Sequence, residues 1–280
     1  MVWSLQAVPP LSDSQFAQWS KLLEDRAGIY LSDQQRVFLQ TQVAMRMRSL
    51  GYDDFSAYYD HVVDGLAGML EWTRLIDHLV VNETSFFRHR PSTEFIGQFV
   101  QERLLKGKTE FDLWSVGCSS GEEPYSLGMV INDAFEMAMR EPRFSIVATD
   151  ISRAALSLAK TAVYGARKLE ILEPRHKQRY FQTVAPGQYQ VSATLRDRTC
   201  FNQGNVLNIN EMPEIKVDAI YCQNLLVYFR RWLREHILSA FVERLKSGGV
   251  LVIGVGEIVD WCHPQVTRLM ANGVQAYKKN

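Results

Sequence analysis

The 280-residue sequence contains little that would indicate a zinc site, a membrane span or an export signal. Its four cysteines are widely spaced and form no CxxC pair: Cys118, Cys200, Cys222 and Cys262. This spacing argues against a zinc centre and is typical of reduced thiols in a cytoplasm. No apolar run approaches the roughly 20 residues of a membrane span, and residues 1–15 lack the basic start and apolar core of a signal peptide. We expect a cytoplasmic protein without metal that does not insert into a membrane.

An excess of charge of one sign is also missing. The 31 basic and 31 acidic side chains cancel, which disfavours a protein that binds nucleic acid through bulk charge. Apolar residues make up 46% and charged residues 22% of the chain, as in ordinary globular proteins. The length is sufficient for one large domain or two smaller ones.

The first part of the chain shows only helical periodicity. Four helices are predicted: from Ser12 or Asp13 to Gly28, from Ser32 or Asp33 to Gly51, from Asp53 or Asp54 onward, and over residues 69–80. We therefore expect an all-helical N-terminal domain over residues 1–85.

From about residue 108 apolar strands alternate with helical segments. Strands are predicted at 111–116, 144–149, 217–222, 249–255 and 274–278, and helices at 91–106, 123–140, 152–162 and 231–246. This alternation predicts an α/β domain over residues 86–280 with a doubly wound, mostly parallel sheet. Alternating polarity around turn residues predicts a small antiparallel hairpin inserted at about 186–203.

The stretch WSVGCSSGEEPYS, residues 114–126, joins a buried strand to a helix through a glycine loop. Gly117 and Gly121 allow a tight turn and a close approach of the backbone to a ligand. A dinucleotide site leaves the following helix N-terminus free for a pyrophosphate, whereas here Glu122 and Glu123 would repel phosphate and attract a cation. The pattern favours S-adenosylmethionine (SAM), which carries an ammonium and a sulfonium, over NAD.

Asp150 ends the second strand of the α/β domain, in the segment FSIVATD. An acidic residue at the carboxyl edge of such a sheet can accept hydrogen bonds from two ribose hydroxyls. Alternatively, Asp150 caps the helix at 152–162, a role that Ser152 could also fill. Because a glycine loop follows the preceding strand, we favour the ribose role.

Residues 82–88, NETSFFR, combine polar and aromatic side chains. Asn82 or Thr84 could cap a helix, and Phe86 and Phe87 are expected in the core. Arg88 offers a guanidinium fork that we expect to pair with a carboxylate, either of the cofactor or of the methyl acceptor.

The segment YCQNLLVYF, at the end of the strand predicted at 217–222, again lies where ligands bind in such sheets. Methyltransferases that act on amino groups often carry Asn or Asp followed by two prolines and an aromatic residue here. This chain has Asn224-Leu225-Leu226 instead, so an amino acceptor is disfavoured. The hydroxyl of Tyr228 could orient a carboxylate, or the side chain could be a core aromatic.

Arg46 and Arg48 lie near the end of the second predicted helix. Basic residues at this position commonly complement the helix dipole or face solvent. If an acidic helical partner docks on the bundle, these two arginines are the natural contacts.

Taken in order, NETSFFR, WSVGCSSGEEPYS, ATDIS, NQGNVL and YCQNLLVYF resemble the motifs of the CheR family of chemoreceptor methyltransferases. The resemblance spans nearly the whole chain, including a closing GVGE. It implies a class I SAM-dependent methyltransferase fold with an N-terminal helical domain and a small β-subdomain. It also implies methyl transfer from SAM, which becomes S-adenosylhomocysteine (SAH), to receptor glutamates as γ-glutamyl methyl esters.

The resemblance also implies roles for individual residues. Cofactor contacts are expected from the segments already described, with Asp150 on the ribose and Glu123, with Glu122, on the ammonium end. The remaining residues expected to contact the cofactor are Asn82, Thr84, Arg88, Gly117, Asn205, Val206, Gln223, Asn224 and Leu225. Arg88 and Tyr228 are expected to act on the acceptor carboxylate, and Arg46 and Arg48 to meet the cytoplasmic helical region of transmembrane chemoreceptors.

Two departures from the family pattern bear on function. Gln223 stands where the family usually has arginine, which favours, as an alternative, a SAM- or SAH-binding regulator that does not turn over. A nucleic-acid N-methyltransferase is the weaker alternative, because net charge is zero and the proline element is missing.

The insertion between Tyr180 and Phe201 is short compared with members that tether to a receptor C-terminal pentapeptide. We expect a monomer that does not need this tether.

The tether hypothesis predicts the outcome of a calorimetric titration. A pentapeptide with the sequence of a receptor C-terminus should give no binding heat with the full chain, because the insertion is short compared with that of members that tether. Measurable affinity would contradict the prediction.

Overall fold

The computed structural model describes residues 10–280. The first nine residues, which hold most of the stretch expected not to be a signal peptide, lie outside the described residues. The chain forms two compact units, residues 1–81 and 82–280, and each is described by itself. Within residues 10–280, no helix combines the length and apolar character needed to cross a bilayer.

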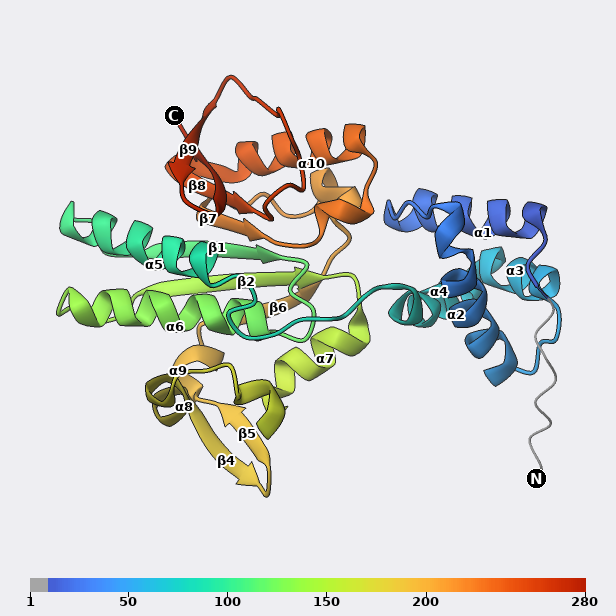
Figure 1. Cartoon of the computed structure of the whole chain (residues 1–280), viewed down its shortest axis with the longest axis horizontal. Helices are drawn as coiled ribbons and strands as arrows, with labels where there is room; N and C mark the ends of the chain where they lie inside the picture. Colours follow the sequence, from blue (N-terminus) through green and yellow to red (C-terminus); the bar gives the residue numbers. More distant parts are fainter. Residues whose placement is uncertain (1–9) are drawn as a thin grey trace. The chain divides into compact units, whose positions relative to one another are not determined.

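The first unit is entirely helical in its described part (Figure 1). Its elements are α1 (Asp13–Ala27), η1 (Asp33–Gln35), α2 (Arg36–Ser49), α3 (Phe55–Val63) and α4 (Gly65–Leu79). Ser12 begins α1 with a capping box that includes Gln15, and Gly28 ends it in the left-handed conformation. The four predicted helices are confirmed, although the second opens with a 3₁₀ turn and the fourth begins earlier.

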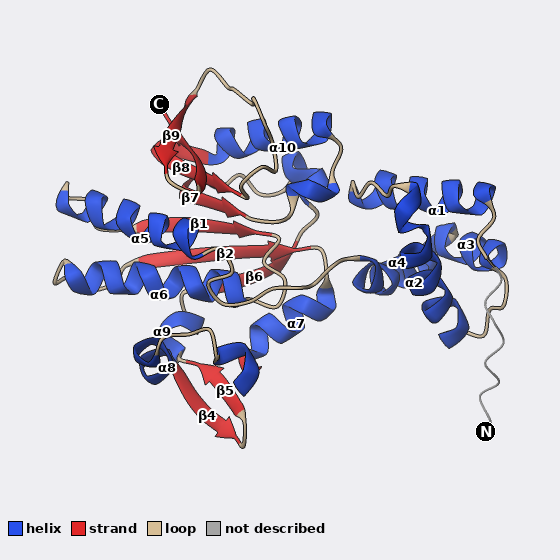
Figure 2. Ribbon diagram, viewed as in Figure 1, coloured by secondary structure: helices blue, strands red, loops and turns tan. Residues whose placement is uncertain are grey.

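The second unit contains a seven-stranded sheet in the order β6-β2-β1-β7-β8-β10-β9 (Figure 2). The pairs among β6, β2, β1, β7 and β8 are parallel, and β10 pairs antiparallel with β8 and β9. The bounds are β1 (Phe111–Val116), β2 (Phe144–Asp150), β6 (Thr199–Gln203), β7 (Val217–Cys222), β8 (Leu245–Ile253), β9 (Val266–Ala271) and β10 (Val274–Lys279). The doubly wound, mostly parallel α/β fold predicted from the sequence is confirmed.

Helices connect these strands and pack against them. They are α5 (Arg90–Leu105), α6 (Glu122–Met137), α7 (Arg153–Thr161), α9 (Ala193–Arg196) and α10 (Arg231–Arg244), with 3₁₀ turns η3 (Val206–Glu211) and η4 (Leu226–Tyr228). Helices α5 and α6 lie side by side (Figure 1). The central strand β1 is buried at five of its six residues, as expected of a strand covered on both faces.

A second, three-stranded antiparallel sheet, in the order β3-β5-β4, is inserted between α7 and α9. It comprises β3 (Val163–Gly165), η2 (Ala166–Leu169), α8 (Pro174–Tyr180), β4 (Phe181–Ala185) and β5 (Gln188–Val191). We call residues 163–191 the small sheet unit. An antiparallel insertion was predicted at 186–203, and β5 lies in that range, but β3 and β4 precede it.

Residues 199–203 belong instead to the main sheet, where β6 pairs parallel with β2. The error has a physical cause, because an edge strand with one covered face shows the same alternating polarity as a hairpin strand. Phe201 packs its ring at 5.6 Å from that of Tyr125 on α6, a tertiary contact that periodicity does not reveal. Strand β9, which pairs with β10, was not predicted either.

The position before α6, Gly121, favours glycine because of its backbone conformation and its close neighbours. Its φ is +94°, and a Cβ there would lie 2.9 Å from both Ala159 Cβ and the Tyr164 hydroxyl. That hydroxyl donates a 2.7 Å hydrogen bond to the Ser120 carbonyl. The absence of a side chain at Gly121 therefore lets α7 and the small sheet unit approach the start of α6.

Substituting Gly121 by alanine should destabilise the fold more than the same change at Gly107. Gly107 has a similar φ of +91°, but a Cβ there would meet nothing within 4 Å, so it reports backbone strain alone. The clash at Gly121 should add about 1–3 kcal/mol to the loss in unfolding free energy. Denaturant unfolding of the two variants measures the difference, and equal losses would contradict this packing argument.

Candidate cofactor and acceptor site

Three segments predicted to bind ligand lie at the carboxyl ends of adjacent parallel strands. Gly117 follows β1, Asp150 ends β2 and Gln223 follows β7, and these strands are neighbours in the order β2-β1-β7. The carboxyl edge of such a sheet is where ligands bind in open α/β folds. The topology therefore gathers these three predicted site residues at one edge.

The loop after β1 is held in a tight conformation by β2. The N–H groups of Gly117 and Cys118 donate to the Thr149 carbonyl at 2.8 and 3.1 Å. Gly117 has a φ of +77°, and a Cβ there would lie 3.2 Å from the side chain of Leu225. Gly117 therefore keeps the backbone turned and open, with Leu225 beside it.

Asp150 organises this loop from the end of β2. One carboxylate oxygen accepts the Ser119 N–H and the other the Ser152 N–H, both at 2.8 Å. Ser152 itself caps α7 by accepting the N–H of Ala155, so the alternative in which Asp150 is the cap is wrong. A carboxylate oxygen can accept more than one hydrogen bond, so these backbone contacts are compatible with a ribose nearby.

The two acidic residues at the start of α6 have different surroundings. Glu122 is fully buried, and its carboxylate pairs with Lys168 Nζ at 2.7 Å and accepts the Ser120 hydroxyl. Glu122 is thus neutralised by a side chain of the same unit. This pairing leaves Glu123 as the carboxylate available to a cationic ligand.

Burial raises the pKa of the Glu123 carboxyl to about 8, and the nearby charges of Glu257 and Asp150 contribute to the rise. A hydrogen bond from the Ser115 hydroxyl at 2.7 Å and the charge of Arg88 oppose this shift. A carboxyl with this pKa is poised to ionise when a positive group arrives. The acidic character predicted for this helix start therefore rests on Glu123.

Glu257, in the loop after β8, is a candidate site residue because its charge contributes to the raised pKa of Glu123, and the sequence analysis did not single it out. Its side chain is 2% exposed, and burial raises its pKa above the ordinary range. Oε2 accepts the Gly254 N–H at 2.7 Å, whereas no donor among the described residues has both the distance and the angle of a hydrogen bond to Oε1. The GVGE segment, an acid directly after an apolar strand, was the signal that could have identified it.

Gln223 and its neighbours line the end of β7. The Gln223 side chain is 9% exposed, and its Nε2 has no hydrogen-bond partner among the described residues. A buried amide without a partner is costly, which marks Nε2 as a donor available to a bound ligand. Asn224 adopts a φ of +58° and is exposed, while Leu225 lies against Gly117.

Segment 82–88 packs against the glycine loop. The Asn82 carbonyl accepts the Ser119 hydroxyl at 3.1 Å, and the Thr84 carbonyl accepts Lys168 Nζ at 2.6 Å. The expectation that Phe86 and Phe87 are core residues is confirmed.

Arg88 is exposed and donates to the Glu83 carbonyl at 2.8 Å. Its charge opposes the burial-driven rise in the pKa of both Glu123 and the Tyr228 hydroxyl. Tyr228 lies half-buried on η4, and burial raises the pKa of its hydroxyl further above the ordinary tyrosine value of about 10, so the hydroxyl is a donor at neutral pH. The structure thus brings Arg88 and Tyr228 within electrostatic reach of one another.

Two predicted adenosine contacts follow β6. Asn205 caps η3 by accepting the Leu207 N–H at 3.0 Å, and Val206 is buried. Asn205 is therefore already part of the local fold, and its side chain is half-exposed.

In the helical unit the two arginines of α2 differ. Arg46 makes a bidentate salt bridge to Glu71 with both contacts at 2.7 Å, and Glu71, 3% exposed, also accepts the Tyr58 hydroxyl. Arg48 is exposed. The guanidinium of Arg46 thus holds α2 to α4, whereas Arg48 lies at the surface of the unit.

Comparison with known proteins decides the family. Residues 82–274 match the family model of the CheR methyltransferase SAM-binding domain, and residues 14–80 match that of the CheR methyltransferase all-alpha domain. The chain belongs to the CheR methyltransferase family. It is therefore a SAM-dependent methyltransferase, which confirms the resemblance seen in the sequence.

Similar proteins carry names from chemotaxis and biofilm formation. A chemotaxis protein methyltransferase of Salmonella typhimurium is 33% identical over 88% of this chain and 84% of its own length. Chemotaxis protein methyltransferase 1 of Pseudomonas aeruginosa is 31% identical over 89% of this chain and 92% of its own. The probable biofilm formation methyltransferase WspC of the same species is 31% identical over 86% of this chain and 56% of its own.

The residues present fit SAM. The ligand brings an ammonium and a sulfonium to a site with the half-buried Glu123 and the buried Glu257, two carboxyl groups of raised pKa. It also brings carboxylate and ribose oxygens, which can accept from the unpartnered Nε2 of Gln223. The donors and acceptors of this edge are thus complementary to the ligand in both charge and hydrogen bonding.

Binding of SAH should release a proton from Glu123. At about pH 7 a carboxyl with a pKa near 8 is mostly protonated, and an ammonium beside it favours the ionised form. Affinity should therefore rise with pH up to about 8, at most tenfold per pH unit. Calorimetry in buffers of different ionisation enthalpy counts the protons.

The Glu123→Gln variant is the control, because it has no proton to release while the ligand's own titration is unchanged. Equal proton counts for the wild type and this variant would show that Glu123 does not face the ligand's cation.

Proposed function

We propose that this enzyme transfers the methyl group of SAM to glutamate side chains of methyl-accepting chemoreceptors. The observation that supports it most is the similarity, along most of both chains, to proteins named chemotaxis protein methyltransferases. The product is a γ-glutamyl methyl ester. The proximity of Arg88 and Tyr228 agrees with an acceptor that is a carboxylate.

When bound, SAM supplies an electrophilic methyl group on its sulfonium. A glutamate acceptor is already ionised at neutral pH, since its reference pKa is about 4.3, so the protein needs no strong base. The enzyme must align the acceptor oxygen with the methyl group and exclude water. Arg88 offers a cationic fork, and the protonated Tyr228 hydroxyl offers a donor, to offset the desolvation of that carboxylate.

The remaining site residues are assigned to the cofactor. In this proposal Glu123 holds the ammonium, and Asp150 accepts the ribose hydroxyls in addition to its two backbone bonds. Asn82 and Thr84 contact the cofactor from segment 82–88, which precedes α5. The adenosine is lined by Asn205, Val206, Gln223, Asn224 and Leu225, with Gly117 allowing close approach of the backbone.

The helical unit is assigned to the receptor. The exposed Arg48 is the contact that we propose for the cytoplasmic helices of the receptor, with Arg46 keeping α2 in place through Glu71. The enzyme would act in the cytoplasm as a monomer without a pentapeptide tether. Similarity to a biofilm formation methyltransferase leaves both flagellar and surface-related chemosensory systems as settings for this activity.

Labelled SAM tests the proposal. Transfer of the labelled methyl group to receptor-containing membranes should give a methyl ester that alkali hydrolyses.

The Tyr228→Phe variant should lower kcat about 10- to 100-fold, because a hydrogen bond to a charged group contributes about 1.5–3 kcal/mol. Arg88→Met should lower it at least as much. The matched control is Arg268→Met, an exposed arginine on the edge strand β9.

Alkali-stable label on RNA or DNA would overturn the proposal in favour of an N-methyltransferase. Tight SAM binding without any transfer would instead indicate a regulator.

A further inference from the structure

The small sheet unit contacts both segments that we assign to the cofactor. Lys168, on η2, donates to the Thr84 carbonyl at 2.6 Å and pairs with Glu122 at 2.7 Å. One ammonium group therefore joins segment 82–88 to the first residue of α6. Tyr164, on β3, donates to the Ser120 carbonyl of the glycine loop at 2.7 Å.

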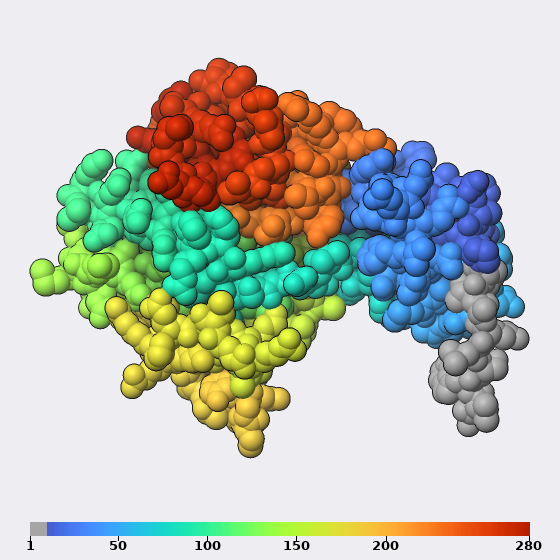
Figure 3. Space-filling view, viewed as in Figure 1, coloured from blue at the N-terminus to red at the C-terminus, as the bar shows by residue number. Residues whose placement is uncertain are grey.

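Aromatic contacts hold the same segment. The ring of Phe86 meets those of Tyr164 and Phe181 edge-on, with centroids 4.9 and 5.4 Å away. The ring of Phe87 stacks on His176 of α8 at 5.3 Å and 7°. The two residues directly before Arg88 are thus fixed by β3, β4 and α8. In Figure 3 the yellow surface of the small sheet unit adjoins the teal surface that leads into α5.

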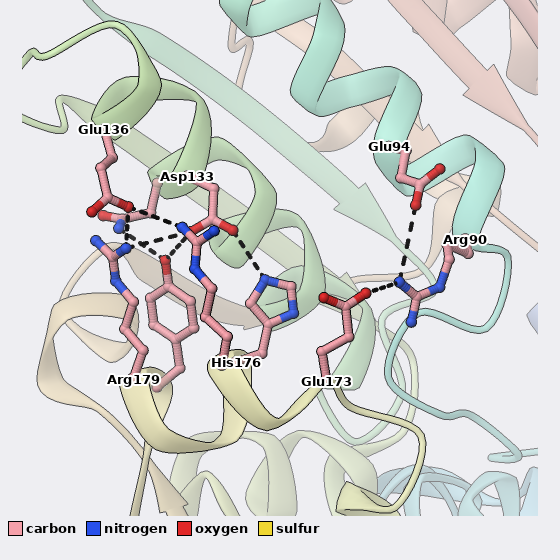
Figure 4. A network of polar contacts seen from close by, with 10 residues as sticks. Arg90, Glu94, Asp133, Glu136, Glu173, His176 and Arg179 are labelled. Carbon is pink, nitrogen blue, oxygen red and sulfur yellow. Dashed lines mark hydrogen bonds and ion pairs between the residues drawn. The ribbon is translucent and has the colours of Figure 1, made fainter.

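Helix α8 is in turn anchored to α6, as Figure 4 shows. Asp133 of α6 accepts the Tyr180 hydroxyl at 2.7 Å and contacts His176 Nε2 at 3.0 Å, and Arg179 pairs with Glu136. A further ion pair of 2.6 Å joins Glu173 to Arg90 at the start of α5. The stacking surface for Phe87 is therefore held in place by the methyltransferase fold itself.

We propose that the small sheet unit is a brace for the cofactor site, with Lys168 as the positioning residue that joins segment 82–88 to the start of α6. The inference rests on the proposed placement of the cofactor against Asn82 and Thr84. Lys168 acts through these groups and does not touch the reacting atoms. As a brace, the small sheet unit has a role within the enzyme that does not depend on a receptor tether.

The central test is the double variant Lys168→Met with Glu122→Gln. Removing both charges avoids leaving a buried carboxylate unpaired, which would by itself destabilise the fold. The SAH dissociation constant measured by calorimetry should rise about tenfold, and amides of residues 84–88 should exchange hydrogen about tenfold faster in the ligand-free protein. Lys168→Arg, which can still donate to both partners, should retain near wild-type affinity.

Lys160→Met is the matched control, since Lys160 is exposed on α7; it should change neither readout. Wild-type affinity and exchange in a folded double variant would overturn the brace. If the double variant does not fold, the Tyr164→Phe variant replaces it, because this change removes the hydrogen bond to the Ser120 carbonyl. It should weaken SAH binding about threefold, and an unchanged affinity would overturn the proposal.

Neither readout involves an acceptor. A wild-type enzyme that binds SAH but fails to methylate receptors would therefore contradict the proposed function without affecting the brace.

Discussion

The partial burial of Glu123, within electrostatic reach of Glu257, is the constraint on which the proposed site depends. Both carboxyl groups have raised pKa values because the fold removes Glu257 and part of Glu123 from water, and the charge of Glu257 further disfavours ionisation of Glu123. Such groups are costly to a fold that has no use for them. A ligand that brings positive charge turns this cost into binding energy. The glycine loop, Asp150 and Gln223 add hydrogen-bonding groups at the ends of the neighbouring strands β1, β2 and β7.

The rest of the second unit can be understood as support for that position. The parallel strands β2, β1 and β7 end together and set the loops in place. The small sheet unit then neutralises Glu122 through Lys168, so that of the two adjacent acids only Glu123 lacks a basic side chain paired with it in an ion pair among the described residues. A similar division occurs on α2, where Arg46 is used internally against Glu71 and Arg48 is exposed. In both pairs, two like side chains that lie close in sequence differ in burial and in partners.

Much of this could be predicted from the sequence, because local patterns determine it. Caps and periodicity predicted the four N-terminal helices, and strand–helix alternation predicted the parallel sheet. The division of labour between Glu122 and Glu123 could not be predicted, since Lys168 is 46 residues away from Glu122 along the chain. The same holds for β6, whose pairing with β2 depends on tertiary contact, and for Glu257, which reaches the site only when β8 lies beside β7.

Direct titration of Glu123 tests the central claim. Carbon-13 labelling of glutamate carboxyl groups, with the resonance assigned by its loss in Glu123→Gln, gives the pKa of this one side chain by NMR. The account predicts a pKa of about 8 in the free protein and a clearly lower value once SAH is bound. A pKa near the ordinary glutamate value of about 4.3 in both states would contradict it.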